Sequence, residues 1–223
     1  MPSYTIVGTP FSTFTRSITL GLQHKDIPYK QVATTPHSDV AYKNHPFGML
    51  PTLIIHGIGN SDIYLCESQA IARYIDRVAP LPSLDLEPGE AGIAVPEKMW
   101  EFVSLAGSQG FPAVEIKVVK HRVQAIDDGK PSDAELREHI KHGVANLKLF
   151  LARMEALMAP EGYVYGWKVT WADFFLFPLL SDLKATPEGE ILSPRMLKWL
   201  AIMEELKAVK DTTAGTLSVG GRP

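Results

Sequence analysis

Short apolar runs alternate with helical stretches over roughly the first 80 residues of the chain. Apolar runs of four or five residues favour strands, and apolar residues spaced by three and four favour helices. We expect strand, helix, strand, two more strands and a helix at residues 3–7, 15–25, 29–34, 52–56, 63–66 and 68–78. The turn sequence at residues 57–62 predicts a β-hairpin. The strand–helix–strand opening predicts parallel strands joined by a right-handed crossover.

Proline and glycine are concentrated between residues 80 and 96, which is typical of a linker. Beyond this segment the spacing of apolar residues is helical. The first helix is expected from residue 97 to about residue 124, with a kink near Gly107, Gly110 and Pro112. A second helix carries an apolar stripe from Ile140 to Met158. The C-terminal part of the chain is therefore predicted to be all-helical.

Two capping sequences mark the starts of later helices. Ser132 with Glu135, and Thr170 with Asp173, have the spacing of a capping box. The helix that follows Thr170 is apolar around most of its circumference, so we expect it at the buried centre of a bundle. A last helix is expected at about residues 194–209, and a loose tail from Asp211. The predicted fold is an α/β domain at residues 1–80 followed by an all-α domain at residues 95–210.

The composition argues against several classes of protein. The net charge is −3 and no basic stripe is present, so we expect no nucleic-acid partner. No apolar run approaches the roughly 18 residues that span a membrane. Cys66 is the only cysteine, which excludes an internal disulfide and fits a reducing compartment. The first residues read as a strand and not as a signal peptide, so a cytoplasmic protein is expected. The histidines are scattered and predict no metal site.

Candidate chemistry is concentrated around Pro51 and Glu67. Pro51 lies where a loop runs into a strand, and Leu50–Pro51 is a candidate cis bond. Such a bend would turn the backbone polar groups of Leu50 outward, where an extended peptide could pair with them. Glu67 and Ser68 stand at a helix start, whose free N–H groups attract a carboxylate, and Glu67 can pair with an ammonium group. These residues predict a site for a small peptide.

Two motifs here resemble the glutathione site of the cytosolic glutathione transferases. The family pattern Asn-Pro-x-Gly-x-Val-Pro is matched by Asn44-His45-Pro46-Phe47-Gly48-Met49-Leu50-Pro51, with His45 replacing Asn and Leu50 replacing Val. The pattern Glu-Ser-x-Ala-Ile is matched by Glu67-Ser68-Gln69-Ala70-Ile71. The resemblance extends over nearly the whole chain. It implies a thioredoxin-like N-terminal domain, an all-helical C-terminal domain, and glutathione as co-substrate without a metal.

Glutathione chemistry requires a thiolate, and a free thiol with a pKa near about 8.5 is mostly protonated at neutral pH. Tyrosine-using transferases carry Tyr where this chain has Gly8, and no cysteine stands in this loop. The segment Pro10-Phe11-Ser12-Thr13-Phe14-Thr15-Arg16 resembles that of the serine-using phi class, which is common in plants and fungi. The resemblance implies Ser12 as the hydroxyl that stabilises the thiolate, with Thr13 as the fallback. The alternative is that both hydroxyls merely cap the following helix.

The resemblance also implies binding residues for each part of glutathione. Leu50, followed by Pro51, would hold the cysteinyl backbone, and Glu67 with Ser68 would hold the γ-glutamyl ammonium and carboxylate. His37 and Lys43 are the candidates for the glycyl carboxylate, although a solvated surface role is the alternative for both. The electrophile pocket would be lined by apolar side chains, whose alternative role is simple core packing: Phe11, Phe14, Phe102, Phe111 and Val114.

The leading hypothesis is a detoxification enzyme that joins the glutathione thiolate to hydrophobic electrophiles, with hydroperoxide reduction as a possible second activity. The resemblance implies a homodimer, with the hairpin at residues 57–62 and adjacent helices contributing to the interface. One alternative is a non-catalytic binding or scaffolding module of the same fold. Another is a pathway-specific glutathione-dependent enzyme. The intact Ser12, Glu67 and Ser68 argue against the non-catalytic module.

Overall fold

The computed structural model describes residues 2–59 and 61–222. It divides into two compact units. One contains residues up to Asp85 together with residues from Glu204 onward, and the other contains Leu86–Met203. An α/β unit and a helical unit were expected from the sequence, and both are present.

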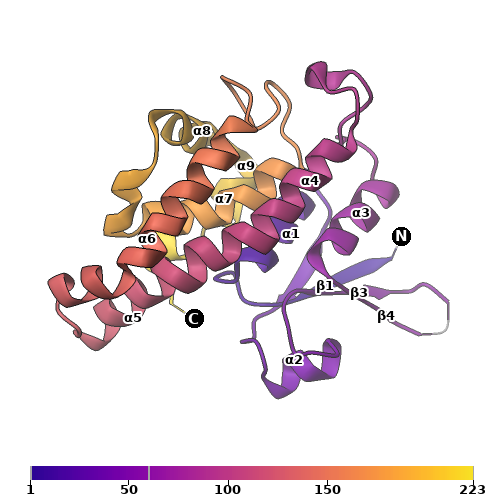
Figure 1. The fold of residues 1–223 in the computed structure, drawn as a ribbon. Coiled ribbons are helices and arrows are strands. Elements are labelled where there is room, and N and C mark those ends of the chain that lie inside the picture. The colour runs from indigo at the N-terminus through magenta and orange to yellow at the C-terminus, as the bar shows by residue number, and fades with distance from the viewer. Residues whose placement is uncertain (1, 60, 223) are drawn as a thin grey trace. The chain divides into compact units, whose positions relative to one another are not determined.

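A four-stranded mixed sheet forms the α/β unit (Figure 1). Its strands are β1 (Ser3–Val7), β2 (Tyr29–Val32), β3 (Thr52–His56) and β4 (Ile63–Cys66), in the order β2-β1-β3-β4. Strand β1 pairs in parallel with β2 and antiparallel with β3, and β3 pairs antiparallel with β4. The parallel opening pair and the hairpin were both predicted correctly, although Asn60 in the hairpin lies outside the described residues.

The first part of this unit contains three helices, and the two longer ones are close to their predicted positions. Helix α1 (Thr13–His24) connects β1 to β2, α2 (Asp39–Asn44) is a short helix before β3, and α3 (Ser68–Val78) follows β4. Helices α1 and α3 pack against one another. Lys25, at the end of α1, forms an ion pair with Asp76 of α3 at 2.5 Å. This buried pair ties the two helices together.

The C-terminal tail is not loose, and this expectation was wrong. The predicted last helix breaks at Leu206 into α8 (Pro194–Glu205) and α9 (Lys207–Asp211), because Leu206 has extended backbone angles. Helix α9 packs against α1. Residues after it form a loop with a 3-10 turn at Leu217–Val219, and Thr216 and Leu217 are buried. The tail therefore belongs to the α/β unit.

The helical unit is built around a long helical rod that lies beside α6 (Figure 1). The rod comprises α4 (Glu97–Leu105), two π-helical stretches (Ala106–Gly110 and Pro112–Val119) and α5 (Lys120–Asp128). Helix α6 is Asp133–Ala156. A short 3-10 turn at Glu90–Gly92 precedes the rod.

The predicted kink lies in the part of the rod that forms π-helical stretches. Pro112 has no N–H, and a wider helical turn accommodates it while Phe111 keeps helical backbone angles. Glycine allows close packing here, because a Cβ on Gly110 would lie 2.7 Å from the Phe150 ring. A Cβ on Gly143 of α6 would lie 2.6 Å from the Lys117 carbonyl oxygen. The glycines in and beside this segment therefore allow close helix packing.

Helix α7 (Trp171–Lys184) is the buried centre of the helical unit, as its apolar circumference predicted. Both oxygens of the Asp173 carboxylate accept hydrogen bonds. Oδ2 accepts from the Thr170 N–H and hydroxyl, and Oδ1 accepts from the Val164 N–H and the Trp199 indole. Burial raises the pKa of Asp173, and these hydrogen bonds oppose that effect. The Thr170–Asp173 capping box is therefore structural.

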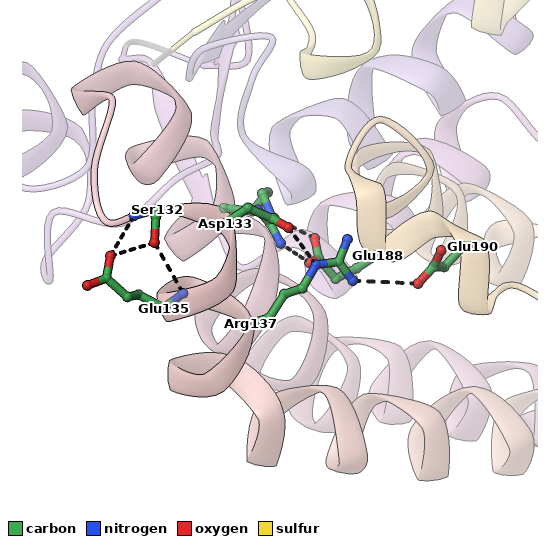
Figure 2. A network of polar contacts seen from close by, with 7 residues as sticks. Ser132, Asp133, Glu135, Arg137, Glu188 and Glu190 are labelled. Atoms are coloured by element: carbon green, nitrogen blue, oxygen red, sulfur yellow. Dashed lines mark hydrogen bonds and ion pairs between the residues drawn. The ribbon is translucent and has the colours of Figure 1, made fainter.

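The start of α6 carries the second predicted capping box and a charged network (Figure 2). The Ser132 N–H donates to the Glu135 carboxylate at 2.9 Å. Asp133 accepts from Arg137 and from Arg122 of α5, and Arg122 also binds Glu188 through two nitrogens. Glu188 lies in the 3-10 turn Pro187–Ile191 that follows α7. In the described part of the chain, no helix is long and apolar enough to cross a membrane.

Candidate functional site

Strand register brings the predicted site segments to one end of the sheet. Val7 is paired with both Val32 and Thr52, and Thr52 is paired with Cys66. Four segments therefore emerge at the same end of the sheet: the loop after β1, the segment after β2, the segment before β3 and the start of α3. Ser12, His37, Leu50 and Glu67 lie on these four segments, one on each.

Leu50 and Pro51 stand directly before β3, and the peptide bond between them is cis. The cis bond was predicted from the sequence and is confirmed. His37 lies next to this segment, since its N–H donates to the Gly48 carbonyl at 2.7 Å. The exposed His37 ring also contacts the Tyr42 hydroxyl through Nδ1 at 3.2 Å. Lys43 lies on α2 and is exposed.

Glu67 and Ser68 form the entry to α3. Glu67 has a φ of 69°, which is unusual for a residue with a side chain. Ser68 is the first residue of this 11-residue helix, so the free N–H groups and the positive dipole end of the helix lie at the same end of the sheet. The Glu67 side chain is 79% exposed. Both polar groups can therefore reach a ligand from solvent.

His45 also lies next to Glu67, although the sequence predicted no functional role for it. Its ring is buried, and Nε2 lies 3.8 Å from Glu67 Oε1. Its Nδ1 accepts a hydrogen bond from the Phe47 N–H at 3.0 Å. The replacement of Asn by His within the first motif was the one sequence signal for this contact.

Ser12 precedes α1 at the N-cap position, but its hydroxyl makes no capping hydrogen bond to this helix. Its backbone N–H donates to the Thr9 carbonyl at 3.0 Å, which closes a turn over residues 9–12. Ser12 is half-buried, whereas Thr13 is 5% exposed. The hydroxyl of Ser12 thus stands at the positive end of α1 without serving as a helix cap.

Gly8 occupies the position where tyrosine-using transferases carry their tyrosine. A Cβ on Gly8 would lie 2.3 Å from Thr15 Oγ1, and Thr15 is fully buried. The Val32 carbonyl accepts a hydrogen bond from the Gly8 N–H at 2.9 Å, and the Gln31 side chain donates one to the Gly8 carbonyl at 2.9 Å. The backbone of Gly8 is therefore fixed on both sides, and no tyrosine side chain fits at this position.

The residues predicted for the electrophile pocket belong to different units. Phe11 and Phe14 are half-buried in the α/β unit. In the helical unit, Phe102 and Val114 are buried, and the half-buried Phe111 ring has the Lys120 ammonium 5.4 Å from its centre. Phe102 packs edge-on against Tyr165. The pocket stays a prediction.

No group of three or more metal-ligating side chains occurs within residues 2–59 and 61–222. The histidine rings of His121 and His139 contact each other edge-on, with 5.1 Å between their centres. Cys66 is half-buried and its thiol faces the Asn44 carbonyl at 3.6 Å. The polar groups at the end of the sheet are thus hydroxyl, carboxylate, imidazole and backbone groups.

Family models give the decisive comparison. The model described as glutathione S-transferase, N-terminal domain, matches residues 6–83, and the model for the C-terminal domain matches residues 136–210. The chain belongs to the glutathione S-transferase family. The N-terminal α/β unit is thus the thioredoxin-like domain of this family. No curated protein sequence matches the chain.

Solved structures of similar fold cover nearly the whole chain of this family member. FzlA from C. crescentus has a TM-score of 0.76 at 16% identity, over 95% of this chain and 92% of that chain. Glutathione transferase F7 from Populus trichocarpa has a TM-score of 0.69 at 20% identity, over 94% and 97%. A glutathione S-transferase-I bound with lactoylglutathione has a TM-score of 0.73 at 21% identity, over 95% and 99%. At these identities the comparison shows the shared fold.

Proposed function

We propose that this transferase-family chain is a serine-type glutathione transferase that joins the glutathione thiolate to hydrophobic electrophiles. The observation that carries the proposal is the convergence of Ser12, Leu50 and Glu67 at one end of the sheet. This convergence follows from the pairing of Thr52 with both Val7 and Cys66. The proposed thiolate donor and the proposed peptide-binding groups thus lie at the same end of the sheet.

The position of Ser12 before α1 supports its role as the thiolate donor. Its hydroxyl makes no capping bond with α1, so its proton can be donated to the glutathione sulfur. The hydrogen bond and the positive end of α1 both favour the anion over the thiol. The sulfur then attacks an electrophilic carbon, a C–S bond forms, and the leaving group departs with its electron pair. Ser12 remains a hydrogen-bond donor throughout this step.

The remaining groups would hold the peptide in place. Glu67 would bind the γ-glutamyl ammonium, and Ser68 with the first N–H groups of α3 would bind the γ-glutamyl carboxylate. The Leu50 backbone would pair with the cysteinyl residue. His37, whose N–H donates to the Gly48 carbonyl, is the first candidate for the glycyl carboxylate, and Lys43 is the second. Phe11 and Phe14 would contact the electrophile from the α/β unit.

Turnover with a chlorinated nitroaromatic compound tests the proposal. Ser12→Ala should lower kcat by about tenfold to hundredfold, since a hydrogen bond to a charged group contributes ~1.5–3 kcal/mol. Glutathione affinity, measured by calorimetry, should change little. Thr13→Val is the matched control and should retain most activity. A wild-type rate for Ser12→Ala with a collapse in Thr13→Val would move the donor to Thr13.

A binding module is the competing function. It would bind glutathione in calorimetry with an affinity that depends on Glu67, yet show no turnover with nitroaromatic, alkyl or hydroperoxide substrates. Reduction of a hydroperoxide in the same panel tests whether the Ser12-stabilised thiolate also attacks oxygen. The structure favours the enzyme because the Ser12 hydroxyl would have no role in a module that only binds the peptide backbone.

We further propose that the chain acts as a homodimer through the β4 edge of its sheet. Strand β4 is an outer strand, and its Ile63 and Tyr64 are exposed, as is Ile58 in the hairpin. Exposed apolar side chains on an edge strand are typical of an interaction surface. Tyr64→Lys should give a monomer in sedimentation velocity, whereas an unchanged sedimentation coefficient would contradict this interface.

A further inference from the structure

The C-terminal loop of the α/β unit reaches the turn that carries Ser12. Helix α9 packs against α1, and the loop of residues 212–221 follows it. The loop is fastened internally, because the Thr213 hydroxyl donates to the Val209 carbonyl at 2.7 Å. The Thr216 hydroxyl donates to the Thr213 carbonyl at 2.6 Å, and the Gly221 N–H donates to the Thr216 carbonyl at 2.8 Å. It is therefore an ordered extension of α9.

Gly215 is a residue of this loop with little free space between it and the turn. A Cβ on Gly215 would lie 3.3 Å from Pro10 Cβ and 3.4 Å from Pro10 Cγ. On its other side, a Cβ on Gly221 would lie 2.5 Å from the carbonyl carbon and oxygen of Gly215. Gly215 thus lies between Gly221 and the ring of Pro10, with little room for a side chain on the Pro10 side.

Pro10 transmits any displacement to Ser12 because both lie in one tight turn. The Ser12 N–H donates to the Thr9 carbonyl at 3.0 Å, and the Ser12 carbonyl accepts from the Arg16 N–H at 2.9 Å. The pyrrolidine ring fixes φ of Pro10, so a push on the ring moves the turn as a body. The Ser12 hydroxyl moves with it.

We infer that Gly215 is a positioning residue for Ser12: the C-terminal loop supports Pro10 and so sets the distance from the Ser12 hydroxyl to the glutathione sulfur. This inference rests on the proposed function. It predicts that the end of the chain controls the ionisation of bound glutathione without contacting it. Displacements well below 1 Å matter here, because a misplacement of about 1 Å can cost roughly a hundredfold in rate.

A pair of glycines allows a controlled experiment. Gly215 and Gly220 have nearly the same positive φ, 77° and 80°, but nothing lies within 4 Å of a Cβ on Gly220. Alanine at either position should therefore cause the same loss of stability through backbone strain. Only alanine at Gly215 pushes on Pro10. Gly220→Ala is therefore the matched control for Gly215→Ala. Gly215→Val and Gly220→Val repeat the comparison with a larger side chain at each position.

The readout is the thiolate absorbance of bound glutathione as a function of pH, together with kcat and KM. Gly215→Ala should lower the bound thiolate fraction, and kcat with it, by about threefold at a pH below the pKa of the bound thiol, which corresponds to a small displacement of the donor. KM for glutathione should stay unchanged, and Gly215→Val should have a larger effect. Gly220→Ala should match the wild type in thiolate fraction while showing the same loss in thermal stability as Gly215→Ala.

Variants in a Ser12→Ala background separate this inference from the proposed function. If Gly215 acts through Ser12, Gly215→Ala should have no further effect on thiolate fraction once Ser12 is removed. A full additional effect would overturn the positioning role, and so would a wild-type thiolate fraction in Gly215→Ala when Ser12→Ala alone lowers it. An unchanged thiolate fraction in Ser12→Ala would overturn the donor assignment and this role together.

Discussion

His45 Nε2 lies 3.8 Å from Glu67 Oε1 while His45 Nδ1 accepts the Phe47 N–H. In the neutral imidazole, one nitrogen accepts and the other carries the proton. Because Nδ1 is the acceptor here, the proton of the neutral ring is on Nε2 and faces Glu67. The buried ring thus presents a fixed polar group to a carboxylate that is itself 79% exposed. The imidazole thus lies beside the helix entry, while the Glu67 carboxylate stays exposed to solvent.

Replacing His45 with Asn should weaken glutathione binding and leave the chemical step intact. Asn is shorter and removes the imidazole beside Glu67, so KM for glutathione should rise by about twofold to fivefold, as expected from the loss of one weak polar contact. A raised KM with an unchanged kcat is expected when a contact binds the substrate and the transition state equally well. His56→Asn, which removes a surface histidine paired with Asp62, is the control. A fall in kcat at constant KM in His45→Asn would contradict the proposed binding role of this contact.

Gly8→Ala should destabilise the α/β unit because its methyl would collide with the buried Thr15 side chain. Overpacking of this kind costs about 1–3 kcal/mol of unfolding free energy, measurable by chemical denaturation. Thr15→Ala in the same chain should recover part of that loss by making room. Gly57→Ala has a positive φ of 78° but nothing within 4 Å, so it controls for backbone strain. Equal losses in Gly8→Ala with and without Thr15→Ala would show that the collision is not the cause.

Lys25→Met should be one of the most destabilising single changes in this unit. The ammonium forms an ion pair with Asp76 and donates to the Ala79 and Pro82 carbonyls at 2.8 and 2.6 Å. The substitution breaks a buried ion pair and removes a donor from two carbonyls, and breaking a buried pair typically costs about 3–5 kcal/mol. Lys98→Met breaks an exposed pair with Glu101 and should cost under ~1 kcal/mol. A loss in Lys25→Met no larger than in Lys98→Met would refute the importance of the buried pair.

Glu115 should make the helical unit less stable as pH rises. Burial raises the pKa of this carboxyl well above its ordinary value, and Asp182 adds to the shift while Lys120 opposes it. Above about pH 4 the unfolded chain releases this proton while the folded chain keeps it, so the free energy of unfolding falls with increasing pH. Glu115→Gln cannot ionise and should remove this dependence.

Chemical denaturation at several pH values measures the effect of Glu115→Gln. The variant should gain stability relative to the unmodified chain between mildly acidic and neutral pH. Glu138→Gln changes an exposed glutamate that pairs with Lys141 on α6, and it should leave the slope unchanged. Parallel pH profiles for the unmodified chain and Glu115→Gln would show that the buried carboxyl does not resist ionisation.

Local sequence patterns determined most of the secondary structure. The hairpin between β3 and β4, the helix entry at Glu67 and the capping boxes at Ser132 and Thr170 each depend on residues a few positions apart. The two glutathione motifs also lie within short segments, so their residues could be assigned to a site before the fold was known. Turn, cap and periodicity signals act over one or two helical turns, and this range is what a single sequence records.

Tertiary structure decided the features that depend on distant residues. The contact of Gly215 with Pro10 spans nearly the whole chain, and the exclusion of a side chain at Gly8 depends on the placement of Thr15. The glycines near Pro112 predicted a kink, and the folded chain forms a π-helical stretch there with Gly110 close to Phe150. Such contacts depend on backbone positions set to within a few tenths of an ångström by the packed core, and close packing is a property of the folded chain that no local pattern contains.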